Sequence, residues 1–383
     1  MTIARTIAEQ IERASWIRKM FEEGARLRAQ GREVFDFTLG NPDLEPPAAV
    51  TDALQKYAGR TGLHGYMPNA GFPRVREVMA ERMSRATGLG YTAGHIIMTV
   101  GSAGAINTVL KAILDPGDEV IVLTPYFPEY RFYIGNHQGR MVEVPTDDCF
   151  RPDPESIASA LTPRTRALIL NTPNNPSGAL YTEHELRAID GVLAGTNVIV
   201  IADEPYRSIV FDGRVMPETS RFITRCVTAM SWSKAQGLAG ERIGYIAISP
   251  RLEWAEELRN ACTFTNRILG YINAPAIWQW VECEAGEAAV DARVYEARRN
   301  LLWDALVRIG YRGCRPEGAF YLFPETPVPD DVAFIRRLQR EGVLTVPGSG
   351  FARPGHFRVS LTVPDQMLER AIPGFERAFR DPE

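Results

Sequence analysis

The sequence predicts an α/β protein, with a mostly parallel sheet that carries helices on both faces and a smaller α+β domain after it. Two observations predict this architecture. Between about residues 45 and 265, short apolar segments alternate with amphipathic segments, which is the pattern of strands alternating with helices. The apolar segments are hydrophobic throughout rather than at every second residue, and strands of that kind are buried on both faces of a parallel sheet.

Seven strands and several helices are predicted in this first part of the chain. The strands lie near Ile96–Thr99, Glu119–Leu123, Arg140–Val144, Ala167–Leu170, Val198–Ala202, Cys226–Met230 and Gly244–Ile248. A helix is predicted over residues 101–114, where apolar side chains recur at helical spacing. Another begins at Thr182, which forms a capping-box pattern with Glu185.

The two ends of the chain have different patterns. Residues 8–30 show apolar side chains at helical spacing and predict an N-terminal arm that packs on the smaller domain. Residues 266–309 are predicted to be largely helical, and strands follow near Phe320–Phe323, Val343–Val346 and Phe357–Leu361. We therefore expect an arm over 1–44, a large domain over 45–283 and a small domain over 284–383.

The composition excludes several classes of protein. The chain has 383 residues, of which 45% are hydrophobic and 23% charged, as in ordinary globular proteins. A net charge of −4 argues against nucleic-acid binding. No apolar run approaches the roughly 18 residues of a membrane helix, and the charged N-terminal segment lacks a signal-peptide core, so a cytoplasmic protein that binds no membrane is predicted.

The cysteines and histidines predict neither disulfides nor a metal site. Five cysteines are scattered along the chain without a CxxC pair, which favours reduced thiols in the cytosol. No pair of His and Cys has the spacing of metal ligands, so no metal is expected.

One lysine lies in a chemically specialised segment. Lys234 follows Ser231 and Ser233, and Arg242 comes eight residues later with glycines between them. A lysine that only serves solubility needs none of these neighbours. A lysine that holds an aldehyde cofactor as a Schiff base needs a phosphate site beside it, which hydroxyl and guanidinium groups supply.

Other candidate ligand-binding residues, both polar residues and glycines, follow the ends of predicted strands, as Lys234 does. Asp203 ends the apolar segment from residue 198, Asn175 lies in a turn-rich loop after residue 170, and Gly101–Gly104 follow the strand at residue 99. Ligands of open α/β sheets bind beyond the carboxyl ends of strands. These residues are therefore expected to meet at one site.

At these segments the chain resembles the class I/II aminotransferases, which have the aspartate aminotransferase fold. The resemblance runs from about Phe37 to about Leu361 and rests on six segments in the family's order and spacing. It implies the fold of the large domain of pyridoxal 5′-phosphate (PLP)-dependent transferases, PLP as the cofactor, and a homodimer with shared active sites. The implied reaction moves an amino group between an L-amino acid and a 2-oxo acid.

The resemblance also implies a role for each candidate cofactor residue. Lys234 carries the cofactor and moves the substrate proton, Asp203 pairs with the pyridine nitrogen, and Phe127 stacks on the ring. Tyr206 and Asn175 contact the phenolic oxygen. The phosphate is bound by Ser102, Ala103, Gly104, Ser231 and Arg242, with Ser233 as a possible contact and Tyr66 reaching it from the neighbouring subunit.

Three residues are implied to bind the substrate. Arg358 suits the α-carboxylate because its guanidinium forms paired hydrogen bonds with a carboxylate. It alternates with Phe357 and Val359 and therefore faces away from them. Gly40 and Asn175 are the other implied contacts of the carboxylate.

Plainer interpretations exist for single residues. Asp203 at a strand end is also typical of a helix cap or an ion pair, Phe127 of a core aromatic, and Arg358 of a solvated edge strand. The glycines at 101 and 104 also suit an ordinary strand-to-helix turn. The whole ordered set, rather than any one residue, favours the functional interpretation.

Two rival functions share the motifs. A PLP-dependent β-elimination C–S lyase has nearly the same residues, and a PLP-binding regulator is disfavoured because the segment before Phe37 is too short for a DNA-binding domain. The substrate stays open among aspartate, aromatic, alanine-type and branched-chain amino acids. Arg18, Lys19 and Arg267 are candidates for binding a distal carboxylate.

Overall fold

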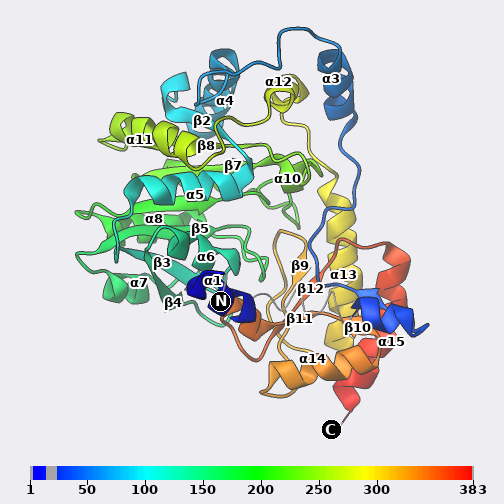
Figure 1. Cartoon of the computed structure of the whole chain (residues 1–383). Coiled ribbons are helices and arrows are strands. Elements are labelled where there is room, and N and C mark those ends of the chain that lie inside the picture. The colour runs from blue at the N-terminus through cyan, green and yellow to red at the C-terminus, as the bar shows by residue number, and fades with distance from the viewer. Residues whose placement is uncertain (1–2, 14–23, 382–383) are drawn as a thin grey trace.

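The computed structural model describes residues 3–13 and 24–381, and its centre is a seven-stranded sheet (Figure 1). The strand order is β2-β8-β7-β6-β5-β3-β4. In chain order the strands are β2 (Ile96–Thr99), β3 (Glu119–Thr124), β4 (Arg140–Pro145), β5 (Thr165–Asn171), β6 (Ile199–Asp203), β7 (Cys226–Ser231) and β8 (Gly244–Ile248). β8 runs antiparallel to both of its neighbours and the other pairs are parallel. The predicted strands and the mostly parallel sheet are confirmed.

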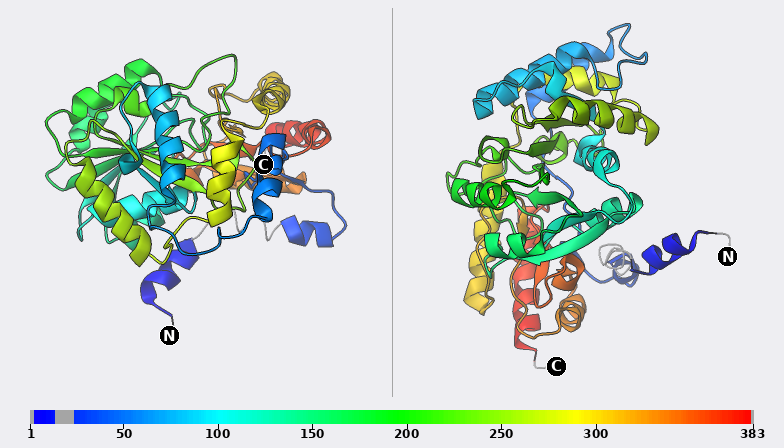
Figure 2. Two further views of the ribbon diagram at one scale, coloured as in Figure 1. Left: turned by 90° about the horizontal axis from the view of Figure 1, so that it is seen from above. Right: turned by 90° about the vertical axis from the view of Figure 1, so that its left-hand side faces the viewer.

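Helices cover both faces of this sheet (Figures 1 and 2). α5 (Gly101–Ile113), α6 (Glu129–Asn136) and α11 (Ala255–Ile268) share one apolar core with side chains such as Val120 and Ile201. α7 (Pro154–Ala160), α8 (Glu183–Leu193) and α9 (Thr219–Phe222) pack on the other face with Ile121 and Val200. The alternation along each strand explains why both faces of the sheet need cover.

The predicted capping box at the start of α8 is confirmed. The Thr182 hydroxyl accepts from the backbone N–H of Glu185, whose carboxylate accepts from the N–H of Thr182. Two orphan donors of the helix end are satisfied in this way, which fixes where the helix begins.

A third group of helices lies at the β2 edge of the sheet. It comprises α3 (Ala48–Ala58), α4 (Pro73–Thr87), the short helix η1 (Ala93–His95) and α12 (Ala276–Ala285). Their apolar faces share a core with Met98 and Ile243. α10 (Trp232–Ala235) is a single turn directly after β7.

The C-terminal region, residues 286–381, folds around a separate core. Its helices are α13 (Ala292–Ile309), α14 (Asp331–Arg340), η2 (Gly348–Phe351) and α15 (Asp365–Arg380). Its strands β11 (Val346–Pro347), β12 (Phe357–Ser360) and β9 (Tyr321–Leu322) form an antiparallel sheet in that order. Phe334, Phe357 and Phe375 lie in this core.

The N-terminal segment reaches this C-terminal region. β1 (Phe35–Asp36) pairs in parallel with β10 (Val343–Leu344). The predicted helix over residues 8–30 is seen as α1 (Arg5–Arg13) and as a helical stretch at 24–29, while residues 14–23 lie outside the described part. α1 projects from the body of the molecule (Figure 2).

No helix of the described residues combines the length and the hydrophobicity that crossing a bilayer requires.

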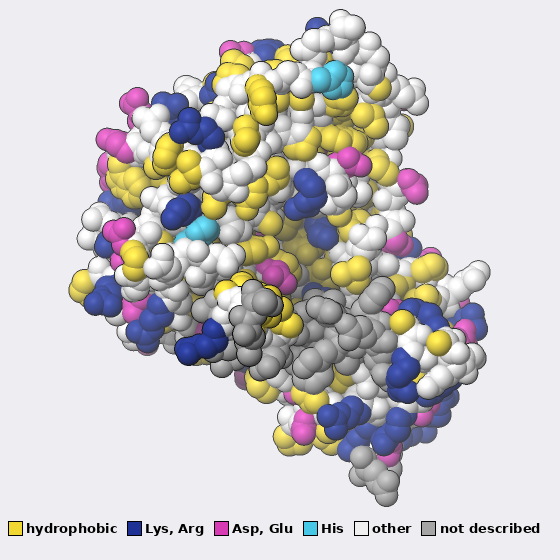
Figure 3. All heavy atoms as spheres, in the orientation of Figure 1, with side chains coloured by type: hydrophobic (Ala, Val, Ile, Leu, Met, Phe, Trp, Pro, Cys, Tyr) yellow, Lys and Arg dark blue, Asp and Glu magenta, His cyan; other side chains and the backbone are white. Residues whose placement is uncertain are grey.

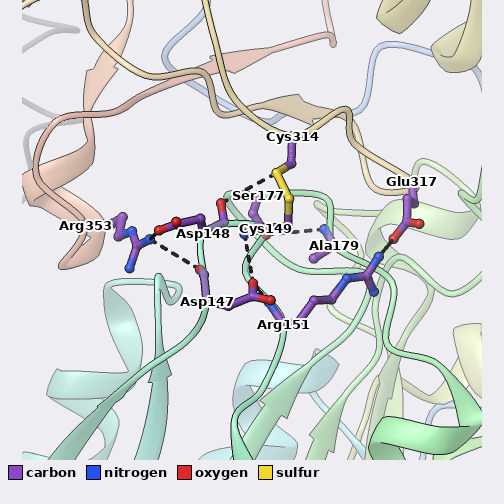
Figure 4. Close-up of a disulfide and its surroundings, with 9 residues drawn as sticks. All are labelled: Asp147, Asp148, Cys149, Arg151, Ser177, Ala179, Cys314, Glu317 and Arg353. Atoms are coloured by element: carbon purple, nitrogen blue, oxygen red, sulfur yellow. Dashed lines mark hydrogen bonds and ion pairs between the residues drawn. A yellow bond between two sulfur atoms is a disulfide. The ribbon is translucent and has the colours of Figure 1, made fainter.

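The prediction that all five cysteines are reduced is wrong for two of them. Cys149, after β4, and Cys314, after α13, form a disulfide (Figure 4). They are 165 residues apart in the sequence, and folding brings their Cα atoms to 5.4 Å, within the range that a disulfide spans. Sequence spacing carried no sign of this contact because it depends on how the C-terminal region packs against the loop after β4. Cys226, Cys262 and Cys283 are free.

Candidate active site

The candidate site is a cavity of about 300 Å³ at the carboxyl ends of the central strands. Its lining residues come from the sheet, from α5 and α6, and from the C-terminal region. They are Leu39, Gly40, Ser102, Ala103, Phe127, Tyr133, Asn171, Asn175, Asp203, Pro205, Tyr206, Ser233, Lys234, Ala239, Arg242, Tyr321 and Arg358. The parallel strands place their C-terminal residues at this edge, as the sequence predicts.

Lys234 lies in the single turn of α10, which the side chain of Ser231 caps. Its Nζ donates a hydrogen bond to the Gly40 carbonyl at 2.9 Å. Burial lowers the pKa of Lys234 to about 8, and the positive charges of Arg358 and Arg242 act in the same direction. A larger share of this amine is therefore neutral near pH 7 than of an exposed lysine, which suits a nucleophile or a base.

Asp203 is the last residue of β6 and is buried. The hydroxyl of Tyr130 donates to its Oδ2 at 2.5 Å, and the side-chain amide of Asn171 donates to its backbone carbonyl at 2.9 Å. Burial raises the pKa of Asp203 to about 6, against the opposing hydrogen bonds of Tyr130 and Ser102. The carboxyl is therefore mostly ionised at pH 7, and it presents a negative charge to the cavity.

Arg358, on β12, is 1% exposed, which excludes the interpretation as a solvated edge residue. Its Nη1 donates to Asn175 Oδ1 at 2.9 Å and its Nη2 to the Thr38 carbonyl at 2.6 Å. The guanidinium also lies 4.5 Å from the ring centroid of Tyr321. These contacts fix the plane of the guanidinium, so a carboxylate meets it in one orientation.

Gly40 is required at its position by close packing. A Cβ atom there would lie 1.8 Å from the hydroxyl oxygen of Tyr321. The Tyr321 hydroxyl also lies 3.2 Å from that of Tyr206. Any side chain at residue 40 would therefore push apart the tyrosines that line this wall of the cavity.

The other end of the cavity is rich in hydrogen-bond donors. Ser102 and Ala103 lie in the first turn of α5, and Ser233 and Arg242 face the same space. Gly101 has a φ of +77°, and a Cβ there would lie 2.9 Å from Nη2 of Arg242. Free backbone N–H groups at a helix start, hydroxyls and a guanidinium are the groups that bind phosphate.

The residues present fit PLP, the cofactor that the resemblance implies. Oδ1 of Asp203 is a buried acceptor without a hydrogen-bond partner in the described structure, as a pyridinium nitrogen requires. The donors around Arg242 suit the phosphate, and Lys234 supplies an amine between the two ends. An acceptor at one end of the cavity and donors at the other therefore match a molecule with a cationic ring and an anionic tail.

Four predicted residues do not line the cavity. Ser231 lies behind Ser233, and their hydroxyls are 2.7 Å apart. Gly104 is buried against Val100 on the first turns of α5. Tyr66 is 93% exposed and is absent from the lining. Arg267 lies on α11 over the ring of Phe264; Arg18 and Lys19 fall outside the described residues.

Sequence reasoning missed three tyrosines and one backbone contact. Tyr130 and Tyr133 come three and six residues after Phe127, the aromatic residue that was singled out there, and this spacing was the available signal. Tyr321 was placed in a strand, but nothing in the sequence shows which wall that strand forms. The carbonyl of Thr38 carries no side-chain signal at all.

Comparisons with known proteins agree with this geometry. The family model for aminotransferases of class I and II matches residues 32–375. The aspartate/prephenate aminotransferase of Thermus thermophilus is 36% identical over 369 residues, which cover 92% of this chain and 93% of that protein. The aspartate aminotransferase of Geobacillus stearothermophilus is 32% identical, with 93% and 94% covered.

Solved structures give the same result. An amino transferase from Eubacterium rectale has a TM-score of 0.94 at 34% identity, with 99% of each chain covered. The aspartate aminotransferase of Thermus thermophilus with maleate has a TM-score of 0.87 at 33% identity, covering 99% of this chain and 100% of that one. The chain therefore belongs to the class I and II aminotransferases and is a PLP-dependent transaminase.

Proposed function

We propose that the described cavity is the active site and that Lys234, Asp203 and Arg358 carry the reaction. The observation that carries this proposal is that these three charged side chains, from β6, α10 and β12, line one cavity. PLP, when bound, supplies an aldehyde that condenses with amines and a ring that accepts electrons from the substrate α-carbon.

Each side chain has one task in this proposal. Arg358 and Asn175 hold the α-carboxylate of the amino acid, so that the α-carbon lies in one orientation. Lys234, whose pKa is lowered by burial, removes the proton from the α-carbon of the amino acid and returns a proton to the cofactor. Asp203 keeps a negative charge at the ring nitrogen, and Tyr206 and Asn175 are the proposed partners of the phenolic oxygen.

For the phosphate we propose Ser102, Ala103, Ser233 and Arg242, with Ser231 and Gly104 supporting them from behind. Ser231 supports Ser233 by accepting from its backbone N–H at 3.1 Å. Phe127 is proposed to stack on the ring; it lies against Tyr130 with their ring centroids 5.6 Å apart. Arg242 bonds the Ala239 carbonyl, which holds its guanidinium near the start of α5.

We further propose an aspartate, aromatic or alanine-type amino acid as the substrate. Among the described lining residues, the cationic side chains are Lys234, Arg242 and Arg358, and each has a task above. The rest of the wall includes the neutral side chains of Leu39, Tyr133 and others. The relatives named aspartate aminotransferases make aspartate the substrate to compare against.

A screen of purified protein distinguishes these substrates. Aspartate, phenylalanine, tyrosine and alanine are each offered with 2-oxoglutarate or pyruvate, and kcat/KM is measured from the 2-oxo acid formed. The highest value for a neutral amino acid would agree with a lining whose described cations all have other tasks. A higher kcat/KM for aspartate than for every neutral substrate would show that a cation outside the described lining residues binds the side-chain carboxylate of the substrate.

We also propose a homodimer with shared active sites. Tyr66 is 93% exposed, and Phe264 and Ile268 on α11 are about half exposed, at 53% and 50%. Hydrophobic side chains gather on the upper part of the face in Figure 3, over the region of α4, α11 and α12. Exposed apolar area of this kind is typical of a surface that another chain covers.

A mixing experiment tests whether Tyr66 acts across the subunit interface. Lys234→Ala and Tyr66→Phe chains are each expected to be impaired, because one lacks the base and the other a phosphate contact. In mixed dimers one of the two sites has both residues, so activity should exceed the average of the two parent samples. Mixed dimers, verified by mass, that show only that average would show that Tyr66 does not act across the subunit interface.

We also propose boundaries for the domains. We infer an arm over 1–44, a large domain over 45–283 and a small domain over 284–383, supported by the β1–β10 pairing and by the separate core of the C-terminal region. We also propose a cytoplasmic location. Disulfides are rare in that compartment, and those that occur there mostly act in catalysis or redox sensing.

A further inference from the structure

Tyr130 is a buried residue that contacts the carboxylate of Asp203. It lies on α6, and its hydroxyl donates to Oδ2 of Asp203 at 2.5 Å. Tyr130 is 1% exposed and Asp203 is 5% exposed, so water does not replace this bond. The other oxygen, Oδ1, has no partner within the described part of the chain, although Asp203 lines the cavity.

The chemistry of the pair fixes which atom donates. Burial, and then the charge of Asp203, raises the pKa of Tyr130 well above its ordinary value, so its hydroxyl stays protonated. Its hydrogen bond opposes the effect of burial on the pKa of Asp203. This bond, together with that of Ser102, favours the ionised carboxylate, and because it occupies Oδ2 it leaves Oδ1 free for a ligand.

We propose that Tyr130 is a positioning residue that holds Asp203 ionised with Oδ1 directed at the cofactor's ring nitrogen. This inference rests on the proposed role of Asp203. It assigns Tyr130 no contact with substrate or cofactor, because Tyr130 does not line the cavity.

The test compares PLP with an analogue in which the ring nitrogen is replaced by C–H. Dissociation constants for both are measured by equilibrium dialysis on the wild type and on Tyr130→Phe. We expect the wild type to prefer PLP, and we expect the variant to lose at least about ten-fold of that preference with little change in its affinity for the analogue. The unchanged affinity for the analogue shows that the cavity itself is intact.

Tyr126→Phe is the matched control. Its hydroxyl also donates to a carboxylate, that of Glu143 at 2.7 Å, but Tyr126 does not line the cavity. The control should keep the wild-type preference. An equal preference in the wild type and Tyr130→Phe, or an equal loss for both ligands, would overturn the role of Tyr130 alone. A wild type without any preference would overturn this inference together with the proposed role of Asp203.

The disulfide carries a second, independent inference. Cys149 is exposed and Cys314 is half-buried, and both line a surface hollow of about 370 Å³ together with Ser177 and Glu317. A thiol reagent therefore has access to the bond. The bond joins the loop after β4 to the C-terminal region (Figure 4).

A short chain of contacts leads from this bond to the candidate active site. The backbone N–H groups of Glu317 and Gly318, just after Cys314, both donate to the Gly178 carbonyl at 3.0 Å. Gly178 belongs to the loop that carries Asn175, whose Oδ1 accepts from Arg358. On the other side, the Glu317 carboxylate pairs with Arg151, two residues from Cys149.

We infer that the Cys149–Cys314 disulfide is a redox-sensitive link that sets how firmly Asn175 and Arg358 hold the substrate carboxylate. A dithiol reductant cleaves it: the S–S bond breaks, two electrons and two protons pass to the sulfurs, and the reductant becomes a disulfide. The inference rests on the proposed role of Arg358. In the reduced form, hydrogen bonds, ion pairs and the close packing of Pro316 and Gly318 on Gly178 hold these residues on the loop without a covalent bond.

The test compares oxidised and dithiol-reduced protein after both have been gel-filtered and alkylated. We expect reduction to lower the melting temperature, because the bond closes a loop of 165 residues, and to raise KM for the amino acid several-fold with little change in kcat. Cys149→Ser should have the melting temperature and KM of the reduced form, and neither value should change when the reductant is added. Cys283→Ser, which removes a free cysteine, should respond as the wild type does.

Three outcomes would overturn the redox link. One is alkylation of Cys149 and Cys314 without a reductant. The second is an equal KM in the oxidised and reduced forms. The third is a response to the reductant that persists in Cys149→Ser. The proposed role of Arg358 is tested separately by its own substitution, so the two failures are distinguishable.

Discussion

Lys234→Ala is expected to lose at least about 10²- to 10⁴-fold in kcat, the usual effect of removing a general base. The amine of Lys234 is buried in the cavity and its pKa is lowered to about 8, so it is the group there best suited to move a proton near neutral pH. Borohydride treatment followed by mass spectrometry should attach PLP to the wild type and not to the variant. Steady-state kinetics measure the loss.

Lys111→Ala is the control for Lys234. Lys111 is an exposed lysine on α5, outside the cavity lining. Its substitution should leave both the kinetics and the borohydride product unchanged. Near-normal turnover by Lys234→Ala, or attachment of the cofactor to another lysine in the wild type, would contradict the assignment.

Arg358→Lys is expected to lower kcat/KM by about 2–5 kcal/mol, which is roughly 30- to 5,000-fold. Lysine keeps the charge but loses the paired N–H groups that meet a carboxylate. The buried Arg358 is held by Asn175 and by the Thr38 carbonyl, and an ammonium group cannot replace both contacts and also bind a substrate.

The pattern across substrates decides the role of Arg358. Every amino acid has an α-carboxylate, so the loss should be similar for aromatic, aliphatic and acidic substrates. Arg370→Lys, an exposed residue that pairs with Glu33, should change nothing. A loss confined to acidic substrates would mean that Arg358 binds the distal carboxylate of the side chain instead.

The fold of the large sheet was predictable because its strands are apolar throughout. Segments such as β5 and β6 are buried on both faces, and a strand buried in this way needs apolar residues at nearly every position, which the sequence shows directly. The antiparallel direction of β8 could not be predicted from its residues, because strand direction depends on the path of the connection rather than on the strand's own sequence.

The candidate site was predictable where function imposes special residue types on strand ends. Lys234, Asp203 and Asn175 follow apolar strands, and the structure places all three at one cavity. Tyr130 and the Thr38 carbonyl were missed because their roles arise from contacts with segments 73 and 320 residues away. The Cys149–Cys314 bond was mispredicted for the same reason.

A single half-reaction tests the central claim most directly. PLP-loaded protein is mixed with an excess of an amino acid that the screen has identified as a substrate, without any 2-oxo acid, and the products are counted. Transamination predicts one 2-oxo acid per active site, no ammonia, and the cofactor converted to its amine form, which an added 2-oxo acid reverses. Continued release of ammonia and 2-oxo acid beyond one per site, with the cofactor unchanged, would contradict a transaminase and identify the lyase.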